Sequence, residues 1–567
     1  MQYEEGVKSL EEFKNVSNSL KNYGVSISTR EDNQSYTINM TTFDSMNKLK
    51  FSLGSLFIII GTLVCYSVIS RLVNDQIIRI GTKKAIGLYQ REILLSYLSY
   101  TGLALIIGLM FGCLVAFGVV EQILIGNLRS LMLAPVKSFY FSFKDVLPVF
   151  VIQLVIMEGA TYMACSSMVK RNVTELLQGP KTSFGKRRFY ESFKLWDRLS
   201  LLSKTIVNNF VNDKRRVFAT IVGIAGCTAL IVSSLTFRNN VLKSIDLQFE
   251  RYYHFDSFVT FSDESAMKEI EKVLDKHNLE YIETNRTLTK IKTDNDISAI
   301  IYLYVYDGDL NKVMTVETAD KNNPYTGDGV WVGESIQHFY KLDNQTDFAV
   351  TTTSGVSFDV TTAGFNKNHT QNNFMIMDAQ TYEMLSGEEF AANCLTLNLN
   401  GLDREVLKDE LKNIDGFLSL SDYKTSASNL FNVFKLMANV MVAVYIGLSF
   451  LMAVFVIYNL LSMYIAEKKK ELIVLMINGF SLKQARRYIY SDTILLTVIG
   501  VILGCLLGYV IGDYSITSLE NSYIRFVHEI DWISILVGVV FTSIMTFAVS
   551  VVSLKKIEKF KLTELPK

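Results

Sequence analysis

Two short charged segments, each placed between long apolar runs, hold the side chains best suited to recognise another protein. Segment 74–89 alternates apolar and basic residues at a spacing that predicts an amphipathic helix lying along a membrane and ending at a glycine. The alternative is a helix that only anchors the chain at the membrane surface. The residues concerned are Arg79, Lys83, Lys84 and Gly87 in the first segment, and Glu467, Glu471 and Gly479 in the second.

No residue pattern in the chain predicts catalysis, a cofactor or a metal site. A phosphate-binding loop needs Gly-x4-Gly-Lys-Ser/Thr, whereas Gly185-Lys186-Arg187 lacks the hydroxyl residue and the preceding strand. The five histidines are scattered and show no metal-ligand spacing. Any energy from ATP must therefore come from a partner protein.

Glu158 and Asn459 are the candidate polar groups within apolar runs. An ionised carboxylate is costly inside a membrane, so Glu158 should face protein or water and find a partner there. Its role stays open between a functional relay and a structural hydrogen bond to another span.

The composition places these residues in a membrane protein. Hydrophobic residues make up 49% of the 567 residues and charged residues only 20%. Seven apolar runs are each long enough to cross a bilayer: 51–70, 93–120, 146–169, 217–237, 436–466, 493–512 and 532–554. The fold class predicted is an α-helical polytopic membrane protein of about seven spans.

The basic residues alternate between loops and so set the orientation. Segment 170–216 has twelve Lys or Arg residues, whereas 513–531 has only Arg525. Because basic loops favour the cytoplasm, residues 1–50 and 238–435 should be extracytoplasmic, in a multi-pass protein of the cell membrane. Neither the charge balance nor its distribution indicates a nucleic-acid partner. The basic cluster at 186–188 predicts contact with anionic membrane lipid.

The long outer segment predicts an α+β domain with two lobes, because strand and helix patterns alternate along it. Strands are expected at 257–261, 281–284, 297–306, 348–353, 356–362, the start of 374–385, and 394–399. Helices are expected at 264–277, 333–342, the end of 374–385, and 404–413.

An internal duplication organises the membrane part. At a constant offset of 392 residues, Gly479 follows Gly87, and a second glycine pattern follows the first. Glycines four residues apart on one helix face allow close helix packing, which we expect at the interface between the two blocks; a substrate groove is the alternative. These glycines are Gly108 and Gly112 in the first block, and Gly500, Gly504 and Gly508 in the second.

The motif from Asn459 through Glu467, Glu471 and Gly479 to Ser481 resembles that of FtsX-like permeases of ABC transporters, of the macrolide-exporter or mechanotransmission type. Arg79 to Gly87 resembles the same motif. The two copies depart from each other, with Arg79 where the second copy has Glu471. The resemblance implies coupling helices at both segments, docked on a separate ABC ATPase that is expected to be a dimer.

The same resemblance implies a domain organisation. It predicts a remnant of an outer domain at 1–50, a first membrane block at 51–169, a basic cytoplasmic connector at 170–216, a span at 217–237, the outer domain at 238–435, a second block at 436–554 and a basic tail at 555–567. The first unit is expected to lack its beginning, either because the chain is the later part of a longer architecture or because a short amino terminus is translocated unaided.

The resemblance also implies a function: ATP-driven movement of outer domains for export or extraction of a peptide, lipoprotein or antimicrobial. A non-transporting membrane regulator that activates a cell-wall hydrolase or a sensor kinase is the alternative. The cargo and the direction of transport do not follow from the residues.

Overall fold

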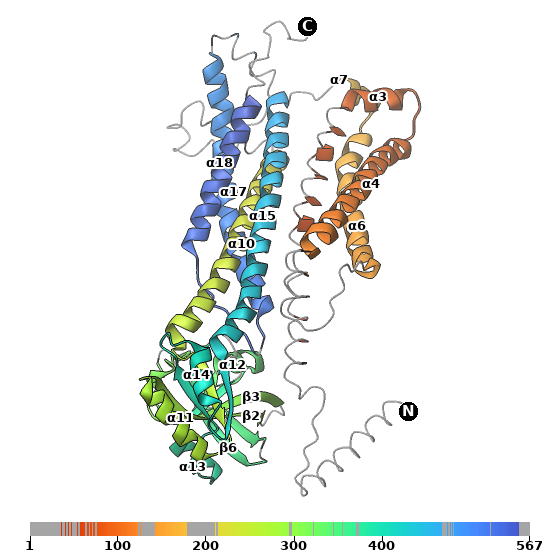
Figure 1. Ribbon diagram of the computed structural model, residues 1–567. Helices are drawn as coiled ribbons and strands as arrows, with labels where there is room; N and C mark the ends of the chain where they lie inside the picture. The colour runs from red at the N-terminus through yellow and green to blue at the C-terminus, as the bar shows by residue number, and fades with distance from the viewer. Residues whose placement is uncertain are drawn as a thin grey trace, which may run out of the picture. The chain divides into compact units, whose positions relative to one another are not determined.

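A computed structural model of the chain describes residues 76–122, 142–178, 214–293, 298–320, 322–343, 345–353, 355–369, 374–467, 481–521 and 523–554, with isolated residues between them (Figure 1). The described chain divides into two compact units. One holds residues 240–434 and 516–528, and the other holds the remaining described helices.

The first unit is built on a nine-stranded mixed sheet in the order β3-β7-β4-β6-β5-β2-β8-β1-β9, in which β3 also pairs with β2. That additional pairing closes six strands into a ring, which leaves those strands without a free edge. The strands are β1 Ser257–Phe261, β2 Glu280–Thr293, β3 Ser298–Asp307, β4 Val330–Gly333, β5 Asp347–Thr352, β6 Ser357–Asn366, β7 Phe374–Asp378, β8 Cys394–Asn398 and β9 Phe417–Asp422.

The long strand β2 belongs to two lobes. Its first residues, from Glu280 to Thr284, pair with β8, and its last, from Thr289 to Thr293, pair with β5. One core fills the six-stranded ring and includes Ile301, Val332 and Phe348. A second core lies under β1, β8 and β9 and is covered by α11 Glu264–Lys276 and α14 Arg404–Leu411.

Sequence periodicity predicts most of this domain, and the structure adds two strands. The expected strand at 257–261 matches β1, and the expected strand-helix pair at 374–385 matches β7 and α13 Ala379–Ser386. The expected helix at 333–342 is α12 Glu334–Tyr340. Strands β4 and β9 were not predicted, because β4 is four residues long and β9 leads directly into the helix that begins at Tyr423.

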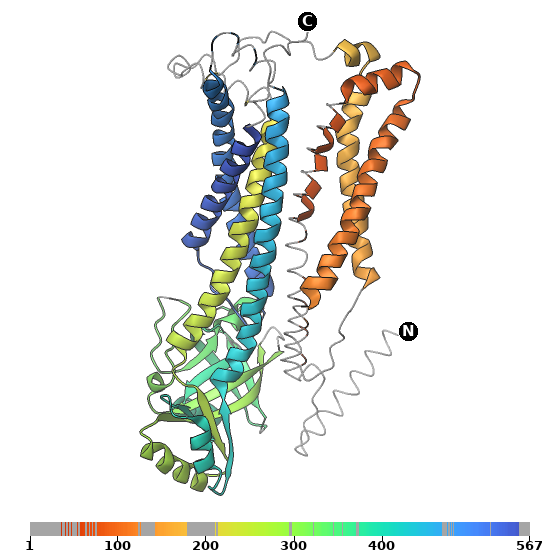
Figure 2. The ribbon, with the colours of Figure 1, turned by 45° about the horizontal axis from the view of Figure 1, so that its top comes forward.

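The second unit consists of long apolar helices (Figure 2). The described residues include six helices long and apolar enough to cross a membrane, at Gln90–Val120, Val146–Ser166, Thr220–Tyr252, Ala438–Phe455, Thr493–Leu519 and Trp532–Ser553. The first expected span, 51–70, is described only at isolated residues, so seven spans are not tested. Most of the expected connector 170–216 and all of the tail 555–567 lie outside the described residues.

Several helices are longer than the predicted spans. α10 runs from Lys214 to Leu247 and continues as a π-helical turn to Tyr252, where a span of 217–237 was expected. α15 runs from Tyr423 to Glu467, and α17 from Leu482 to Leu519. The apolar runs underestimated them because helix hydrogen bonding continues through the polar residues that follow each run.

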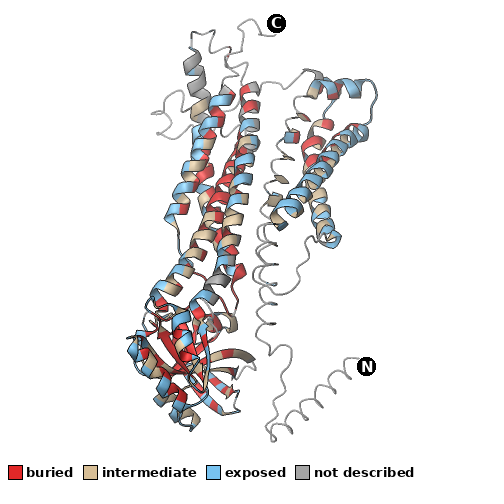
Figure 3. Ribbon diagram, viewed as in Figure 1, coloured by how far each residue is buried: buried red, intermediate tan, exposed pale blue. Residues whose placement is uncertain are grey.

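The helices α10, α15, α17 and α18 (Trp532–Leu554) share one core, which includes Ile224, Ala453, Val501 and Val549. Hydroxyl groups join α10 to two of these helices: Ser449 Oγ of α15 donates a 2.7 Å hydrogen bond to the Cys227 carbonyl, and Thr228 donates to Thr542 of α18 at 3.2 Å. Figure 3 shows the buried residues concentrated along these helices and inside the sheet.

Candidate functional site

The first charged segment forms the short helix α3 Ile77–Ala85, which is capped by Ile86 and followed by Gly87. Gly87 has φ +100°, a left-handed conformation that glycine adopts without a steric penalty. The Gly87 amide donates to the Lys84 carbonyl and the Leu88 amide to the Lys83 carbonyl, each at 3.1 Å. This pair of bonds is the Schellman pattern, which ends a helix sharply and redirects the chain.

One face of α3 is fixed to the helices of its own block. Ile80 is 1% exposed and packs in a core with Ile93, Val169 and Leu176. Lys84 Nζ donates to the Val169 carbonyl at 2.8 Å and to the Arg171 carbonyl at 2.7 Å. These carbonyls close the end of α6 Phe143–Val169, so Lys84 caps that helix. The structure therefore gives Lys84 a partner within the chain.

The other face of α3 and the turn after it are exposed. Arg79 and Lys83 lie on this face. Ile78 is 64% exposed, and Ile86 and Tyr89 are each 76% exposed. Apolar side chains and cations thus lie together on a surface that is anchored from behind, which is the arrangement that a protein-docking element needs.

The turn after α3 has a counterpart 392 residues later. Gly479 has φ +91°, close to the value at Gly87. After the first glycine, the Tyr89 amide donates to Glu92 Oε2 at 2.9 Å; after the second, the Ser481 amide donates to Gln484 Oε1 at 2.8 Å. Each bond is half of a capping box that starts the next long helix. The duplication therefore extends to backbone geometry.

The two acidic residues of the second segment have no described side chains. Glu467 is the last residue of α15, and its side chain lies outside the described residues, as does all of Glu471. Their role as coupling residues stays a prediction. Asn459 lies within α15, and its side chain is likewise not described.

The glycines of α17 lie against α10. A Cβ at Gly504 would meet Thr228 Cβ at 2.5 Å and the Ala225 carbonyl oxygen at 2.7 Å. A Cβ at Gly500 would lie 2.8 Å from Ile224, and one at Gly508 would lie 2.8 Å from Val232. These contacts run from α17 to α10, the helix that precedes the outer domain, whereas packing between the two blocks was expected.

The glycines of the first block are in a different environment. At Gly108 and Gly112, which lie in α4 Gln90–Val115, no described atom comes within 4 Å of the place a Cβ would take. Glycines with the same spacing therefore lie in close contact with a neighbouring helix in α17, whereas in α4 no described residue lies against them.

Glu158 finds a hydrogen-bond donor on the neighbouring helix. Thr101 Oγ1 of α4 donates to Glu158 Oε1 of α6 at 3.0 Å. Glu158 Oε2 is buried and has no partner among the described residues. The hydrogen bond to another span is thus present, and a relay function for Glu158 stays a prediction.

Two helix ends meet at the sheet of the outer domain, a feature that the sequence did not predict. Tyr253, just after α10, and Tyr423, the first residue of α15, have ring centroids 5.7 Å apart. Both belong to one aromatic core with Phe255 and Phe258. The segment that follows α10, the start of α15 and strand β1 therefore share one core.

The loop between α17 and α18 is tied to the same domain; we call residues 520–528 the outer strap. Arg525 Nε lies 3.3 Å from Glu334 Oε1 at the start of α12. The Val527 amide donates to Ser244 Oγ of α10 at 2.8 Å. Tyr523, Ile524 and other apolar strap residues are buried. Arg525, the single Lys or Arg residue of the loop 513–531, was the one signal in the sequence.

A buried histidine supports the outer strap. His369 is 5% exposed, its amide donates to Gln248 Oε1 at 2.8 Å, and its Nδ1 lies 3.1 Å from the Arg525 carbonyl oxygen. Burial lowers the pKa of His369 to about 4, so the ring is neutral at pH 7. Burial raises the pKa of Glu334, against the opposing effect of Arg525 and Lys367.

The described residues contain no group of three or more His, Cys, Asp or Glu side chains that could hold a metal. Every cysteine is free, and Cys394 of the outer domain is buried. Burial raises the pKa of the Cys394 thiol to about 12, which makes it a poor nucleophile.

Comparison with known proteins gives one family match. A family model described as FtsX-like permease C-terminal matches residues 51–173 and 443–562, which confirms the resemblance seen in the motifs and its duplication. No curated protein matches the chain. Together with the six helices, the match shows a multi-pass membrane protein, and the predicted fold class, a polytopic helical protein with an extracytoplasmic α+β domain, is confirmed.

Among solved structures, the chain is similar to the periplasmic region of MacB from Actinobacillus actinomycetemcomitans. The sequence identity is 10%, and the likeness covers 34% of this chain and 98% of that chain with a TM-score of 0.21.

Proposed function

We propose that the chain is the membrane subunit of an ABC transporter, because it carries two copies of the FtsX-like permease domain. In this proposal a separate ATPase, present as a dimer, binds and hydrolyses ATP, and this chain converts its movement into movement of the outer domain. The observation that carries the proposal is the repeated turn at Gly87 and Gly479, which lies inside both matched domains.

The ATPase would bind at the exposed face of α3 and at the corresponding segment of the second copy. Ile78, Ile86 and Tyr89 would supply apolar contact, and Arg79 and Lys83 would orient the partner. Lys84 holds the helix from behind through α6, so that force applied to α3 is passed on instead of bending the helix away. In the second copy, Glu467 and Glu471 would take the orienting role.

The movement would reach the outer domain through unbroken helices. α10 and α15 each continue from the apolar region to the aromatic core around Tyr253 and Tyr423. The outer strap adds a third connection, because Arg525 and Val527 hold the α17–α18 loop to α12 and α10. In this proposal the packed aromatic core and the ion pair between Arg525 and Glu334 pass a displacement of the helices to the outer domain, because neither contact deforms continuously.

The cargo is proposed by family resemblance only: a peptide, a lipoprotein or an amphipathic antimicrobial. A second candidate function is a regulator that does not transport, in which the outer domain activates a cell-wall hydrolase or a sensor kinase. The two differ in what the outer domain binds, so a cross-linked hydrolase or kinase would favour the regulator.

Affinity purification of the full chain from its native membrane tests the proposal. We expect a nucleotide-binding ATPase to co-purify, and substitution of Ile86 and Tyr89 by serine to release it while the chain stays folded. Substitution of Met384, an exposed apolar residue of the outer domain, by serine is the matched control. Purification of an intact membrane complex without any ATPase would reject the proposal.

A further inference from the structure

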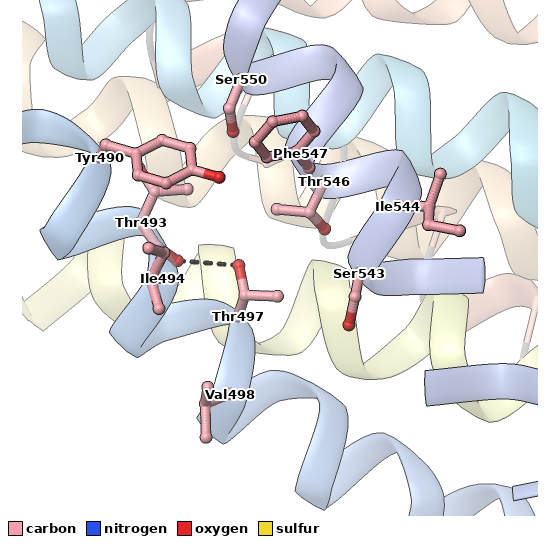
Figure 4. Close-up of a pocket in the computed structure, with 10 residues that line it drawn as sticks. All are labelled: Tyr490, Thr493, Ile494, Thr497, Val498, Ser543, Ile544, Thr546, Phe547 and Ser550. Atoms are coloured by element: carbon pink, nitrogen blue, oxygen red, sulfur yellow. Dashed lines mark hydrogen bonds between the residues drawn. The ribbon is translucent and has the colours of Figure 1, made fainter. Parts of the chain in front are cut away.

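A groove of about 400 Å³ lies between α17 and α18 (Figure 4). Its walls combine two aromatic rings, a row of hydroxyl residues and a few aliphatic side chains. The rings of Tyr490 and Phe547 meet edge to face, with centroids 5.9 Å apart. Figure 4 shows the hydroxyl groups of Tyr490 and Ser550 pointing into the space between the two helices.

Ser550 differs from two threonines of the groove in the partners of its hydroxyl. Thr497 and Thr546 use their hydroxyls within their own helices, on the carbonyls of Thr493 and Thr542 at 2.8 Å each. Ser550, by contrast, is 1% exposed, and its Oγ has no hydrogen-bond partner among the described residues. An unsatisfied hydroxyl is costly where no water is present, so a ligand with an acceptor oxygen would be favoured there.

The rim of the groove faces hydrocarbon. Ile494, Val498, Ile544 and Phe547 are each about half exposed, although they belong to helices that can span a membrane. Molecules that reach this rim from the bilayer are therefore apolar over most of their length. A soluble, polar ligand does not fit such an entrance.

The depth of the groove identifies which part of a lipid it would hold. α18 ends at Leu554 on the cytoplasmic side, directly before the charged residue Lys555. At a rise of ~1.5 Å per residue, Ser550 lies ~6 Å and Ser543 ~17 Å from that end. Since one leaflet of the hydrocarbon core is about 15 Å thick, the groove runs from the level of the lipid esters to the bilayer centre.

We propose that this groove binds one acyl chain of a phospholipid from the cytoplasmic leaflet. The chain lies against Ile494, Val498 and Ile544, and the ester carbonyl accepts hydrogen bonds from Ser550 and Tyr490. The bound lipid completes the contact between α17 and α18 and satisfies the buried hydroxyl. This inference does not depend on which ATPase or cargo the chain serves.

Photocross-linking tests the site with a defined probe. The full chain is reconstituted in vesicles that contain a phospholipid with a photoreactive diazirine in mid-chain, and the labelled peptides are identified by mass spectrometry. We expect label on residues 490–498 and 543–550 above that on Leu536, an exposed residue of α18 outside the groove.

Substitutions separate the groove from the general lipid surface. Ser543→Phe fills the groove from its exposed rim and should abolish the excess label, whereas Ala548→Phe adds the same ring at an exposed position of α18 outside the groove and should leave it. Ser550→Ala removes one hydrogen bond and should lower retention of lipid in native mass spectrometry about threefold. Three results would overturn the proposal. They are even labelling along α18, a label that is unchanged in Ser543→Phe, and cross-links from the groove to another polypeptide.

Discussion

Arg525, in the loop between α17 and α18, lies 3.3 Å from the carboxylate of Glu334 at the start of α12. The two residues are far apart in sequence and belong to different parts of the topology. Both side chains are largely buried, so breaking the pair leaves a desolvated charge without its partner. This contact makes the outer strap part of the outer domain.

Arg525→Ala should release the outer strap. Because Glu334 loses its partner, we expect a loss of about 3 kcal/mol in the local free energy of opening, measured by hydrogen exchange at the strap amides. Arg251→Ala is the control, since Arg251 pairs with Glu317 while 61% exposed and such pairs contribute little. Equal exchange in the two variants would show that the ion pair does not hold the strap.

Gly504→Ala should destabilise the packing of α17 on α10. The new Cβ would lie 2.5 Å from Thr228 Cβ and 2.7 Å from the Ala225 carbonyl oxygen, so the helices must separate, at a cost of about 1–3 kcal/mol. The measurement is the Tm of the purified chain. Gly112→Ala, at the equivalent position of the first block, meets no described atom within 4 Å and should not lower the Tm.

Gly87→Ala and Gly479→Ala should weaken coupling to the ATPase. Each position has a positive φ, and an alanine there costs about 1–2 kcal/mol, which shifts the turn and the helix before it. We expect reduced stimulation of ATP hydrolysis. Gly355→Ala places the same strain, at φ +90°, in the outer domain, and controls for general destabilisation. Equal effects of all three variants on ATP hydrolysis would argue against a special role for the turns.

Lys84 and Lys83 should differ although they are neighbours. Lys84→Met removes two hydrogen bonds to the end of α6 and should lower the free energy of unfolding by about 1.5–3 kcal/mol. Lys83→Met, on the exposed face, should leave stability unchanged and weaken ATPase binding. If the two variants exchanged these effects, the assignment of the two faces of α3 would be reversed.

His369 should make the outer domain less stable in acid. Its pKa is about 4 in the folded protein against an ordinary value of 6.5, so the unfolded chain binds a proton first as the pH falls. Stability is fully present above pH 6.5 and is lost towards pH 4, by up to ~1.4 kcal/mol per pH unit. Glu520, Arg525 and Lys367 are the charged groups that face the ring.

Hydrogen exchange of the outer domain between pH 7 and pH 4.5, corrected for intrinsic rates, measures this loss. His369→Gln should flatten the pH dependence, whereas His338→Gln, at an exposed histidine, should preserve it. A pH profile that is the same in His369→Gln as in the native chain would assign the acid sensitivity to other groups.

Local sequence patterns predict the elements but not their partners. The amphipathic repeat in α11 follows from one face being buried. Strand β1 is buried on both faces, and both elements were predicted within a residue or two. The closure of six strands into a ring depends on pairing between β2 and β3 on one side and β2 and β5 on the other. No pattern within β2 indicates that it has three neighbours.

In the candidate site, too, local features were predicted from the sequence and long-range contacts were not. Gly87 at the end of α3 was predicted, because a helix-ending glycine is a local signal. The capping of α6 by Lys84 and the ion pair between Arg525 and Glu334 were not predicted, because each joins residues that only the fold brings together. The glycines of α17 were recognised as a packing face, but their contact with α10 required the structure.

The most direct test of the proposed function is the ATP hydrolysis rate of the co-purified ATPase in vesicles, with and without this chain. We expect hydrolysis to rise when the native chain is present, and the rise to be lost when Gly87 and Gly479 are both replaced by alanine in a chain that remains folded. Hydrolysis that is the same with and without the chain would contradict the proposal that it couples an ATPase to its outer domain.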